Sequence, residues 1–185
     1  MKNLSLHILD IVQNSIRAGA GTVKVELSDE YDGMMTLRIS DDGKGMDNYQ
    51  LEHVKDPFFS TRKTRKIGLG VSLLTQKAEQ AGGQLSIQSA PGEGTTVNAR
   101  FLTNHPDCPP LGKIPECAWM LMASNPEMRM VFRFTSAMGE SEWDSHLIRE
   151  ELGGLLLTEG LIRISILEWF NADFLKFKHK RHDQG

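Results

Sequence analysis

Hydrophobic positions follow two different periods along the first hundred residues. Apolar side chains at helical spacing, among them Leu4, Ile8 and Ile11, predict a first helix, and a second helix is predicted to stop at Gly82-Gly83. Four shorter stretches alternate apolar and polar residues, which predicts half-buried strands. Strands and helices in this order indicate an α+β layered domain. The predicted helices cover about residues 3–18 and 70–81, and the predicted strands about 22–28, 34–41, 84–89 and 95–102.

A proline-rich stretch separates this pattern from the rest of the chain. Residues 104–112 hold three of the seven prolines, so regular structure is expected to stop there. Beyond it, residues 128–135 alternate as a strand, Asp144 is a good N-cap for a helix ending at Gly153, and Thr158 for one through Phe177. We therefore predict three parts: a domain of residues 1–103, a linker at 104–112, and a small α+β appendage of unassigned role at 113–185.

Charge and composition exclude several classes of protein. Among the 185 residues, 21 Lys and Arg stand against 24 Asp and Glu, a net charge of -3, which is not the footprint of nucleic-acid binding. No apolar run is long enough for a membrane span and the N-terminus lacks the order of a signal peptide, so we expect a cytoplasmic protein. Cys108 and Cys117 have the spacing of neither a zinc site nor a disulfide framework.

A polar stripe runs along the first predicted helix. Asp10, Asn14 and Arg17 are spaced by four and three residues, so they lie on one side of a helix that is otherwise largely apolar. One interpretation is a self-satisfied Asp10–Arg17 pair or a solvent-facing stripe. The other is that Mg²⁺ and phosphates are the missing partners, because an amide oxygen is a hard ligand, a guanidinium suits phosphate and Asp10 could orient a nucleophile.

Asp41 ends a predicted strand and begins a glycine loop. Alternation places its carboxylate on the inner face, where it wants a donor such as an adenine amino group, and Gly43 and Gly45 let the backbone approach a flat ring closely. Thr95 starts the last strand on the same face and could support Asp41 at the base. The alternative is an ordinary acidic turn.

A basic segment leads into a second glycine-rich turn. Four of the five residues 62–66 are Lys or Arg, and Gly68-Leu69-Gly70 then opens a helix whose free N–H groups favour anions. An exposed basic loop is the usual interpretation of such a run. The adjoining glycines favour a phosphate cradle.

These motifs together resemble the GHKL ATPases, which include gyrase, heat-shock chaperone, histidine kinase and mismatch-repair ATPases. Asp10 to Ala20 is similar to the N box, while Asp41 to Gly45, Gly68 to Gly70 and Gly92 to Thr95 are similar to the three glycine boxes. The stretch from Asp56 to Val97 looks most like a histidine kinase catalytic domain. The resemblance covers about residues 3–102.

The resemblance implies a Bergerat fold, a two-layer α/β sandwich that holds Mg·ATP between helices and sheet. Asn14 would ligate Mg²⁺, Asp41 would bind the adenine amino group, and residues 60–70 would form a lid. Lys66 stands where a glycine is frequent, and Asp10 stands where hydrolases carry the longer Glu. With Asp10 as the catalytic residue, the nucleotide site is expected to comprise Asn14, Arg17, Ala18, Asp41, Gly43, Gly45, Met46, Thr61, Arg62, Lys63, Lys66, Gly68, Leu69, Gly70, Val71 and Thr95.

Only nine residues precede Asp10, so we expect a free-standing module. The first hypothesis is a regulator that hydrolyses ATP or transfers its γ-phosphate to a protein partner or phosphoacceptor encoded elsewhere. The second is a nucleotide-gated module with little or no turnover that switches a partner or its own homodimer. A degenerate structural relative is the third, and it is disfavoured because all four sites retain suitable residues.

Overall fold

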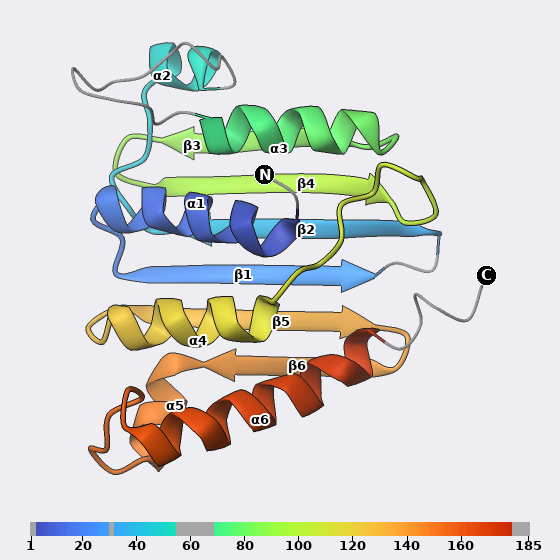
Figure 1. Ribbon diagram of the computed structural model, residues 1–185. Helices are drawn as coiled ribbons and strands as arrows, with labels where there is room; N and C mark the ends of the chain where they lie inside the picture. The colour runs from blue at the N-terminus through green and yellow to red at the C-terminus, as the bar shows by residue number, and fades with distance from the viewer. Residues whose placement is uncertain (1–2, 30–31, 55–68, 179–185) are drawn as a thin grey trace.

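The structure is a computed structural model that describes residues 3–29, 32–54 and 69–178, and its elements are shown in Figure 1. Helices and strands follow one another along the chain in an irregular order rather than in strict alternation. The elements are α1 (Leu4–Arg17), β1 (Thr22–Asp29), β2 (Met34–Asp41), α2 (Asn48–His53), α3 (Leu69–Gln80), β3 (Gln84–Ala90), β4 (Gly94–Leu102), α4 (Ile114–Ser124), β5 (Arg129–Ser136), β6 (Gly139–Asp144), α5 (Ser145–Glu151) and α6 (Gly160–Lys178).

The six strands form one sheet in the order β3-β4-β2-β1-β5-β6. Neighbouring strands are antiparallel except β1 and β5, which pair in parallel from Thr22↔Arg129 to Ser28↔Thr135. In the β2–β4 pair, Asp41 lies opposite Thr95. The sheet therefore brings the glycine loop that begins at Asp41 next to the start of the strand that carries Thr95.

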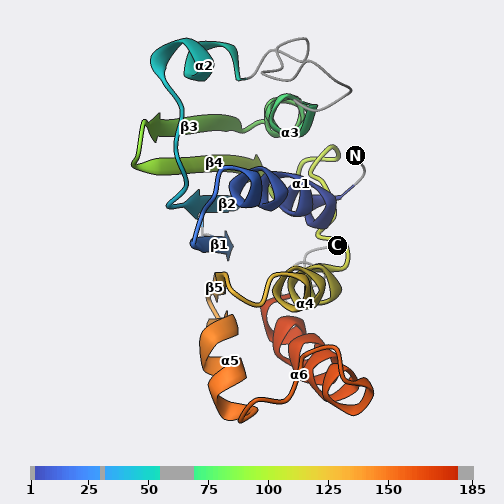
Figure 2. The same ribbon diagram turned by 90° about the vertical axis from the view of Figure 1, so that its left-hand side faces the viewer.

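Helices cover one face of the sheet. Seen along the strands in Figure 2, α1, α3, α4 and α6 lie on one side of the sheet, and α5 lies below β5, where it contacts β5 and β6. The side chain of Asn3 caps α1 by accepting from the Leu6 N–H, and Leu4, Ile8 and Val12 on its inner face are at most 1% exposed. The core thus fills the space between the helical layer and the sheet.

The predicted α+β layered architecture and its two-layer arrangement are confirmed. All six elements predicted before residue 103 are present within one or two residues of the expected bounds, and β5 and α5 also match. Two elements were missed. α4 follows the proline-rich stretch directly, with Pro115 in its first turn where proline costs nothing, and β6 is an edge strand with polar residues around buried Trp143.

The start of the last helix differs by one residue from the expectation, since a cap at residue 158 would make 159 the first helical residue. Thr158 was expected to cap it, but α6 begins at Gly160 because residues 156–159 form a turn. In that turn the Glu159 N–H donates to the Leu156 carbonyl, and the Leu156 N–H donates to the Glu159 side chain. These two hydrogen bonds hold the backbone out of the helix until residue 160.

The proline-rich segment packs against the rest of the chain. Its Pro110 and Leu111 carbonyls accept from the Leu4 and Ser5 N–H groups, which satisfies two free donors at the start of α1. The division into residues 1–103 and 113–185 stays a prediction. The structure adds that residues on both sides of the segment contribute strands to one sheet and side chains to one core.

No helix within the described residues combines the length and the apolar character needed to cross a bilayer.

Candidate functional site

Four parts of the chain meet at one end of the sheet. In Figure 1 the C-terminal end of α1, the end of β2, the turn between β3 and β4, and the start of α3 all lie at the left-hand edge. The antiparallel register brings the end of β2 beside the start of β4, and α1 and α3 pack against each other above them. Most of the described residues that the sequence singled out lie here.

Asp41 is held from two sides at the end of β2. The Ser15 hydroxyl of α1 donates to Asp41 Oδ2 over 2.6 Å, and the Gly43 N–H donates to Asp41 Oδ1 over 3.0 Å. Each carboxylate oxygen has a second lone pair, so the group can accept a further hydrogen bond. Asp41 is therefore a fixed acceptor with capacity for a ligand donor.

Ser89 ties the β3–β4 turn to the glycine loop. Its hydroxyl donates to the Gly94 carbonyl over 2.7 Å, lies 2.9 Å from the Thr95 hydroxyl, and accepts from the Met46 N–H over 2.8 Å. Thr95 faces Asp41 through the backbone register, while its hydroxyl hydrogen-bonds with Ser89. The loop after β2 and the start of β4 are thus joined through one serine.

Two glycines make this close approach possible. Gly45 and Gly94 have φ angles of 65° and 83°, which side-chain-bearing residues rarely adopt. A Cβ at Gly45 would overlap the Ala90 carbonyl, and one at Gly94 would overlap the Asp41 carbonyl. Gly43 is tight as well, because a Cβ there would lie 2.9 Å from the Ala18 side chain. The glycine spacing is thus required by contacts between backbones.

Asp10 lies against the start of α3. A Cβ at Gly70 would overlap the Asp10 carboxylate, so only glycine leaves room for that side chain. Burial raises the pKa of the Asp10 carboxyl above its ordinary value, and the charge of Arg17 offsets part of this. A carboxylate with a raised pKa beside a helix N-terminus is suited to accepting a proton.

His7 lies one turn before Asp10 and is fully buried. Burial lowers its pKa to about 4, so the ring is neutral near pH 7. Neither ring nitrogen has a well-formed hydrogen bond within the described residues, although the Gly70 backbone lies close by.

Asn14 and Arg17 are linked one turn apart on the exposed side of α1. Arg17 Nη1 donates to Asn14 Oδ1 over 3.1 Å. The amide oxygen keeps a second lone pair and the guanidinium keeps further donors. The Asp10–Arg17 pair, one of the two interpretations of this stripe, is not an ion pair within the described residues, where the guanidinium instead donates to Asn14.

The predicted site residues fall into two groups. Within the described part, Asp10, Asn14 and Arg17 come from α1, Asp41 ends β2, and Thr95 begins β4; the rest of this group is Ala18, Gly43, Gly45, Met46, Gly70 and Val71, with Leu69 as the first residue of α3. Ala18 is joined to the glycine loop, since its carbonyl accepts from the Lys44 N–H over 3.0 Å. The lid residues Thr61, Arg62, Lys63, Lys66 and Gly68 lie outside the described residues.

Three further residues, none of them predicted from the sequence, hold this site together. Ser15 and Ser89 fix Asp41 and Thr95, and Asp42 accepts from the Gly21 and Thr22 N–H groups over 2.7 and 2.8 Å. Although burial opposes it, those N–H donors hold the pKa of Asp42 below its ordinary value. A detectable signal existed for Ser15, because a hydroxyl on the inward side of an apolar helix requires a partner.

Comparison with known proteins gives one family for this region. The family model described as histidine kinase-, DNA gyrase B-, and HSP90-like ATPase matches residues 2–105. The sensor histidine kinase ZraS of Klebsiella oxytoca is 35% identical over 89 residues, which is 47% of this chain and 19% of that protein. A putative sensor protein of Shewanella frigidimarina is 31% identical over 97 residues, 51% of this chain and 15% of that protein. The chain thus spans less than a fifth of the length of these two relatives.

A solved structure supports the fold. The N-terminal domain of a DNA repair protein superposes with a TM-score of 0.54 at 16% identity, covering 78% of this chain and 52% of that one. Because the family model covers more than half of the chain, and its match includes α1, β2, α3 and the β3–β4 turn, the protein belongs to the histidine kinase-, DNA gyrase B- and HSP90-like ATPases.

Proposed function

We propose that the protein binds Mg·ATP at this end of the sheet and either hydrolyses it or transfers the γ-phosphate to a protein. The observation that carries the proposal is the Asp41 carboxylate, held by Ser15 and Gly43 with acceptor capacity to spare. A carboxylate can only accept hydrogen bonds, and the adenine amino group is a donor. The glycine loop beside it packs closely on Ala18 and on the Ala90 backbone, which fixes the position of the loop next to this carboxylate.

The polar stripe of α1 supports the phosphate end. Asn14 would hold Mg²⁺ through its amide oxygen, a hard donor of the kind this ion takes alongside phosphate oxygens and water. Arg17 donates one hydrogen bond to Asn14, and its other guanidinium donors would bind a phosphate. Bound Mg²⁺ would supply charge neutralisation for the phosphates. From the sequence alone, the lid residues Thr61, Arg62, Lys63 and Lys66 are proposed to add positive charge and hydroxyl donors.

Asp10 would act as the general base. Its carboxylate is one turn from Asn14, and its raised pKa makes it a better proton acceptor than an ordinary Asp. It would take the proton of an attacking water, or of a hydroxyl on a protein substrate. The γ-phosphate then goes to that oxygen and ADP leaves.

The contact between Asp10 and Gly70 favours a second function. Because Asp10 fills the space beside the first turn of α3, binding of phosphate there could move α3 against α1 without chemistry. The protein would then be a nucleotide-gated module that switches a partner or a homodimer. In either case we propose a cytoplasmic regulatory role, with a protein partner or phosphoacceptor encoded elsewhere.

Two measurements test the proposal. Titration calorimetry with ATP and ADP, each with and without Mg²⁺, should show binding of both nucleotides, with Mg²⁺ strengthening ATP more than ADP. Purified protein with γ-labelled ATP, with and without cell extract, separates free phosphate from phosphoprotein and so hydrolysis from transfer. If neither nucleotide binds the folded protein, the proposal is wrong in both of its forms.

A further inference from the structure

Exposed apolar side chains gather near the β6 edge of the sheet, on α5, α6 and the loop between them. Within the described residues, seven of the eleven large hydrophobic side chains that are exposed lie between residues 145 and 178. Leu147 on α5 is 57% exposed and Trp169 on α6 is 45% exposed. Single exposed apolar residues are ordinary, but such a concentration marks an interaction surface.

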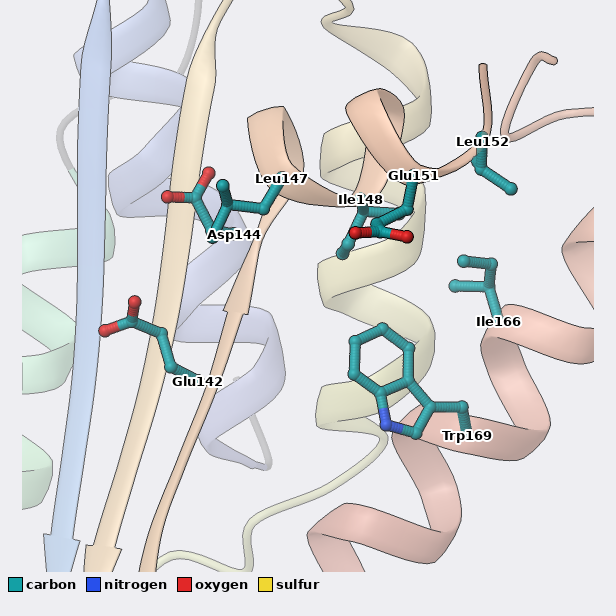
Figure 3. Close-up of a pocket in the computed structure, with 8 residues that line it drawn as sticks. All are labelled: Glu142, Asp144, Leu147, Ile148, Glu151, Leu152, Ile166 and Trp169. Carbon is teal, nitrogen blue, oxygen red and sulfur yellow. The ribbon is translucent and has the colours of Figure 1, made fainter. Parts of the chain in front are cut away.

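A pocket opens within this surface between α5, β6 and α6, as Figure 3 shows. Its apolar lining comes from Leu147, Ile148 and Leu152 on one side and from Ile166 and Trp169 on the other. Its volume is about 290 Å³. Small-molecule sites usually measure roughly 300–1,000 Å³, so this pocket suits one large side chain better than a cofactor.

Of the described residues that line the pocket, three are acidic and none is basic. Glu142, Asp144 and Glu151 contribute carboxylates. Asp144 is paired with Arg129 over 2.6 Å and Glu142 with Arg133 over 2.7 Å. Glu151, at the end of α5, has no ion pair within the part of the chain that the structure describes, so it leaves an uncompensated negative charge at the pocket.

The charge of the surrounding region has the same sign. Residues 139–178 contain eight acidic and four basic side chains, and six of the acidic ones remain once Asp144 and Glu142 are matched with Arg129 and Arg133. Of the basic ones, Arg149 donates to the Met122 carbonyl and Arg163 lies over the Trp119 ring at 4.7 Å, so both are engaged with α4 and its C-terminal end. A second copy of this surface would meet it with like charge, whereas a basic partner would be attracted.

The strand beside the pocket is also unpaired on one side. Among the described residues β6 is the last strand of the sheet, so its outward backbone groups have no neighbouring strand there. An edge strand next to an apolar pocket is a common place for an extended peptide to bind, with backbone hydrogen bonds giving affinity and the pocket giving specificity.

We propose that this pocket is the docking site for a segment of a partner protein that carries one large apolar side chain flanked by Lys or Arg. The apolar side chain enters between Ile148, Ile166 and Trp169, and the flanking positive charges face Glu151 and the acidic rim. The proposal does not rest on nucleotide binding, because the site lies at the β6 edge and involves none of the nucleotide-site residues.

Fluorescence anisotropy of labelled synthetic peptides tests it with the full chain. The probe is a short peptide with a central Phe flanked by Lys, and its matched forms replace Lys by Glu or Phe by Ala. We expect the Lys/Phe peptide to bind, and each replacement to weaken binding about tenfold or more. Equal binding of the Lys and Glu forms, or no binding of the Lys/Phe form, would overturn the proposal.

Variants locate the binding on the protein. Glu151→Lys and Leu147→Ser change exposed side chains and should each weaken the Lys/Phe peptide about tenfold. Glu79→Lys, near the end of α3, makes the same charge change at another exposed helix end, and Leu6→Ser removes an exposed leucine from α1; neither should alter binding. Unchanged binding in Glu151→Lys and Leu147→Ser, with circular dichroism showing both folded, would place the peptide elsewhere and reject the site.

A second copy of the chain is the other occupant that must be distinguished from a basic peptide. Sedimentation velocity over a range of protein concentrations should show the same association state for the wild type and for Leu147→Ser. A dimer that forms in the wild type and is lost in Leu147→Ser would identify this face as a self-interface and overturn the basic-peptide proposal.

Discussion

The Ser15 hydroxyl donates a hydrogen bond of 2.6 Å to the Asp41 carboxylate, joining the last turn of α1 to the end of β2. Ser15 is 2% exposed, so water does not replace this contact. A charged acceptor makes the bond stronger than one between neutral groups. The helix that carries Asn14 and Arg17 is therefore held in register with the strand that carries Asp41.

Ser15→Ala is expected to weaken ATP binding about fivefold, since loss of one such hydrogen bond costs about 1 kcal/mol. Asp41→Asn should weaken it more, by about 1–3 kcal/mol, because an amide can present a donor to the adenine amino group. Titration calorimetry measures both. Ser5→Ala serves as the control on the same helix, where the hydroxyl donates to Asn3 and not to the site.

The two substitutions should also be coupled. In an Asp41→Asn background, Ser15→Ala should cost less than in the wild type, because the acceptor has lost its charge. Wild-type ATP affinity in folded Asp41→Asn would show that Asp41 does not bind the base.

Gly70→Ala is expected to destabilise the fold by about 1–3 kcal/mol, because the added Cβ would overlap the Asp10 carboxylate. Glycine to alanine inside a helix otherwise stabilises by up to about 1 kcal/mol. Gly160→Ala at the start of α6 is the matched control, since nothing lies within 4 Å of a Cβ there. Urea unfolding followed by circular dichroism gives the free energies.

The same collision predicts a rescue. Asp10→Ala removes the overlapping atoms, so Gly70→Ala should cost less in that background than in the wild type. A cost that is equal in both backgrounds would mean that Gly70 is strained by some other contact.

Local patterns predicted the first hundred residues well because the relevant interactions are close in sequence. Alternation predicted which residues of β2 and β4 face inward, and the strand register then shows Asp41 opposite Thr95. The polar stripe of α1 and the glycine spacing likewise follow from backbone geometry.

Contacts between distant segments were beyond this kind of reasoning. The parallel pairing of β1 with β5 joins residues about a hundred positions apart, and no local pattern encodes it. β6 was not predicted because it has only one buried apolar side chain, Trp143, whose ring stacks on Phe170 with centroids 4.0 Å apart. Ser15 was missed because its role depends on where Asp41 lies.

Stability should fall on acidification through His7. Its pKa is lowered to about 4 in the folded state and is near 6.5 when unfolded, so below about pH 6.5 the unfolded chain binds the proton first. Stability is therefore full above pH 6.5 and is lost as pH falls toward 4. Between pH 7.5 and 5 the loss from this group is about 2 kcal/mol.

Urea unfolding at several pH values checks this. His7→Leu, which cannot titrate, should lose about 2 kcal/mol less than the wild type over that range. His146→Gln, at an exposed position at the start of α5, should follow the wild-type curve. If His7→Leu also follows the wild-type curve, protonation of His7 does not limit stability.

Substitutions at Asp10 and Asn14 should separate chemistry from switching. For an enzyme, Asp10→Asn should keep ATP affinity within a few-fold and lose roughly 10²–10⁴ in turnover, the usual contribution of a positioned base. Asn14→Ala should lose both, because it removes the proposed Mg²⁺ ligand and the acceptor of the Arg17 hydrogen bond. Gln13→Ala, one position earlier on α1, is the control.

The acid limb of the pH–rate profile also tests whether Asp10 is the base. Since burial raises the pKa of Asp10, an enzyme that uses it as base should lose activity on acidification at a higher pH than an ordinary Asp would give. For a nucleotide-gated switch, wild-type turnover should be near background, Asp10→Asn should leave the ATP-dependent change in partner or dimer binding intact, and Asn14→Ala should abolish it. Wild-type turnover in Asp10→Asn would exclude Asp10 as the base, because the amide of Asn cannot take up the proton as the carboxylate would.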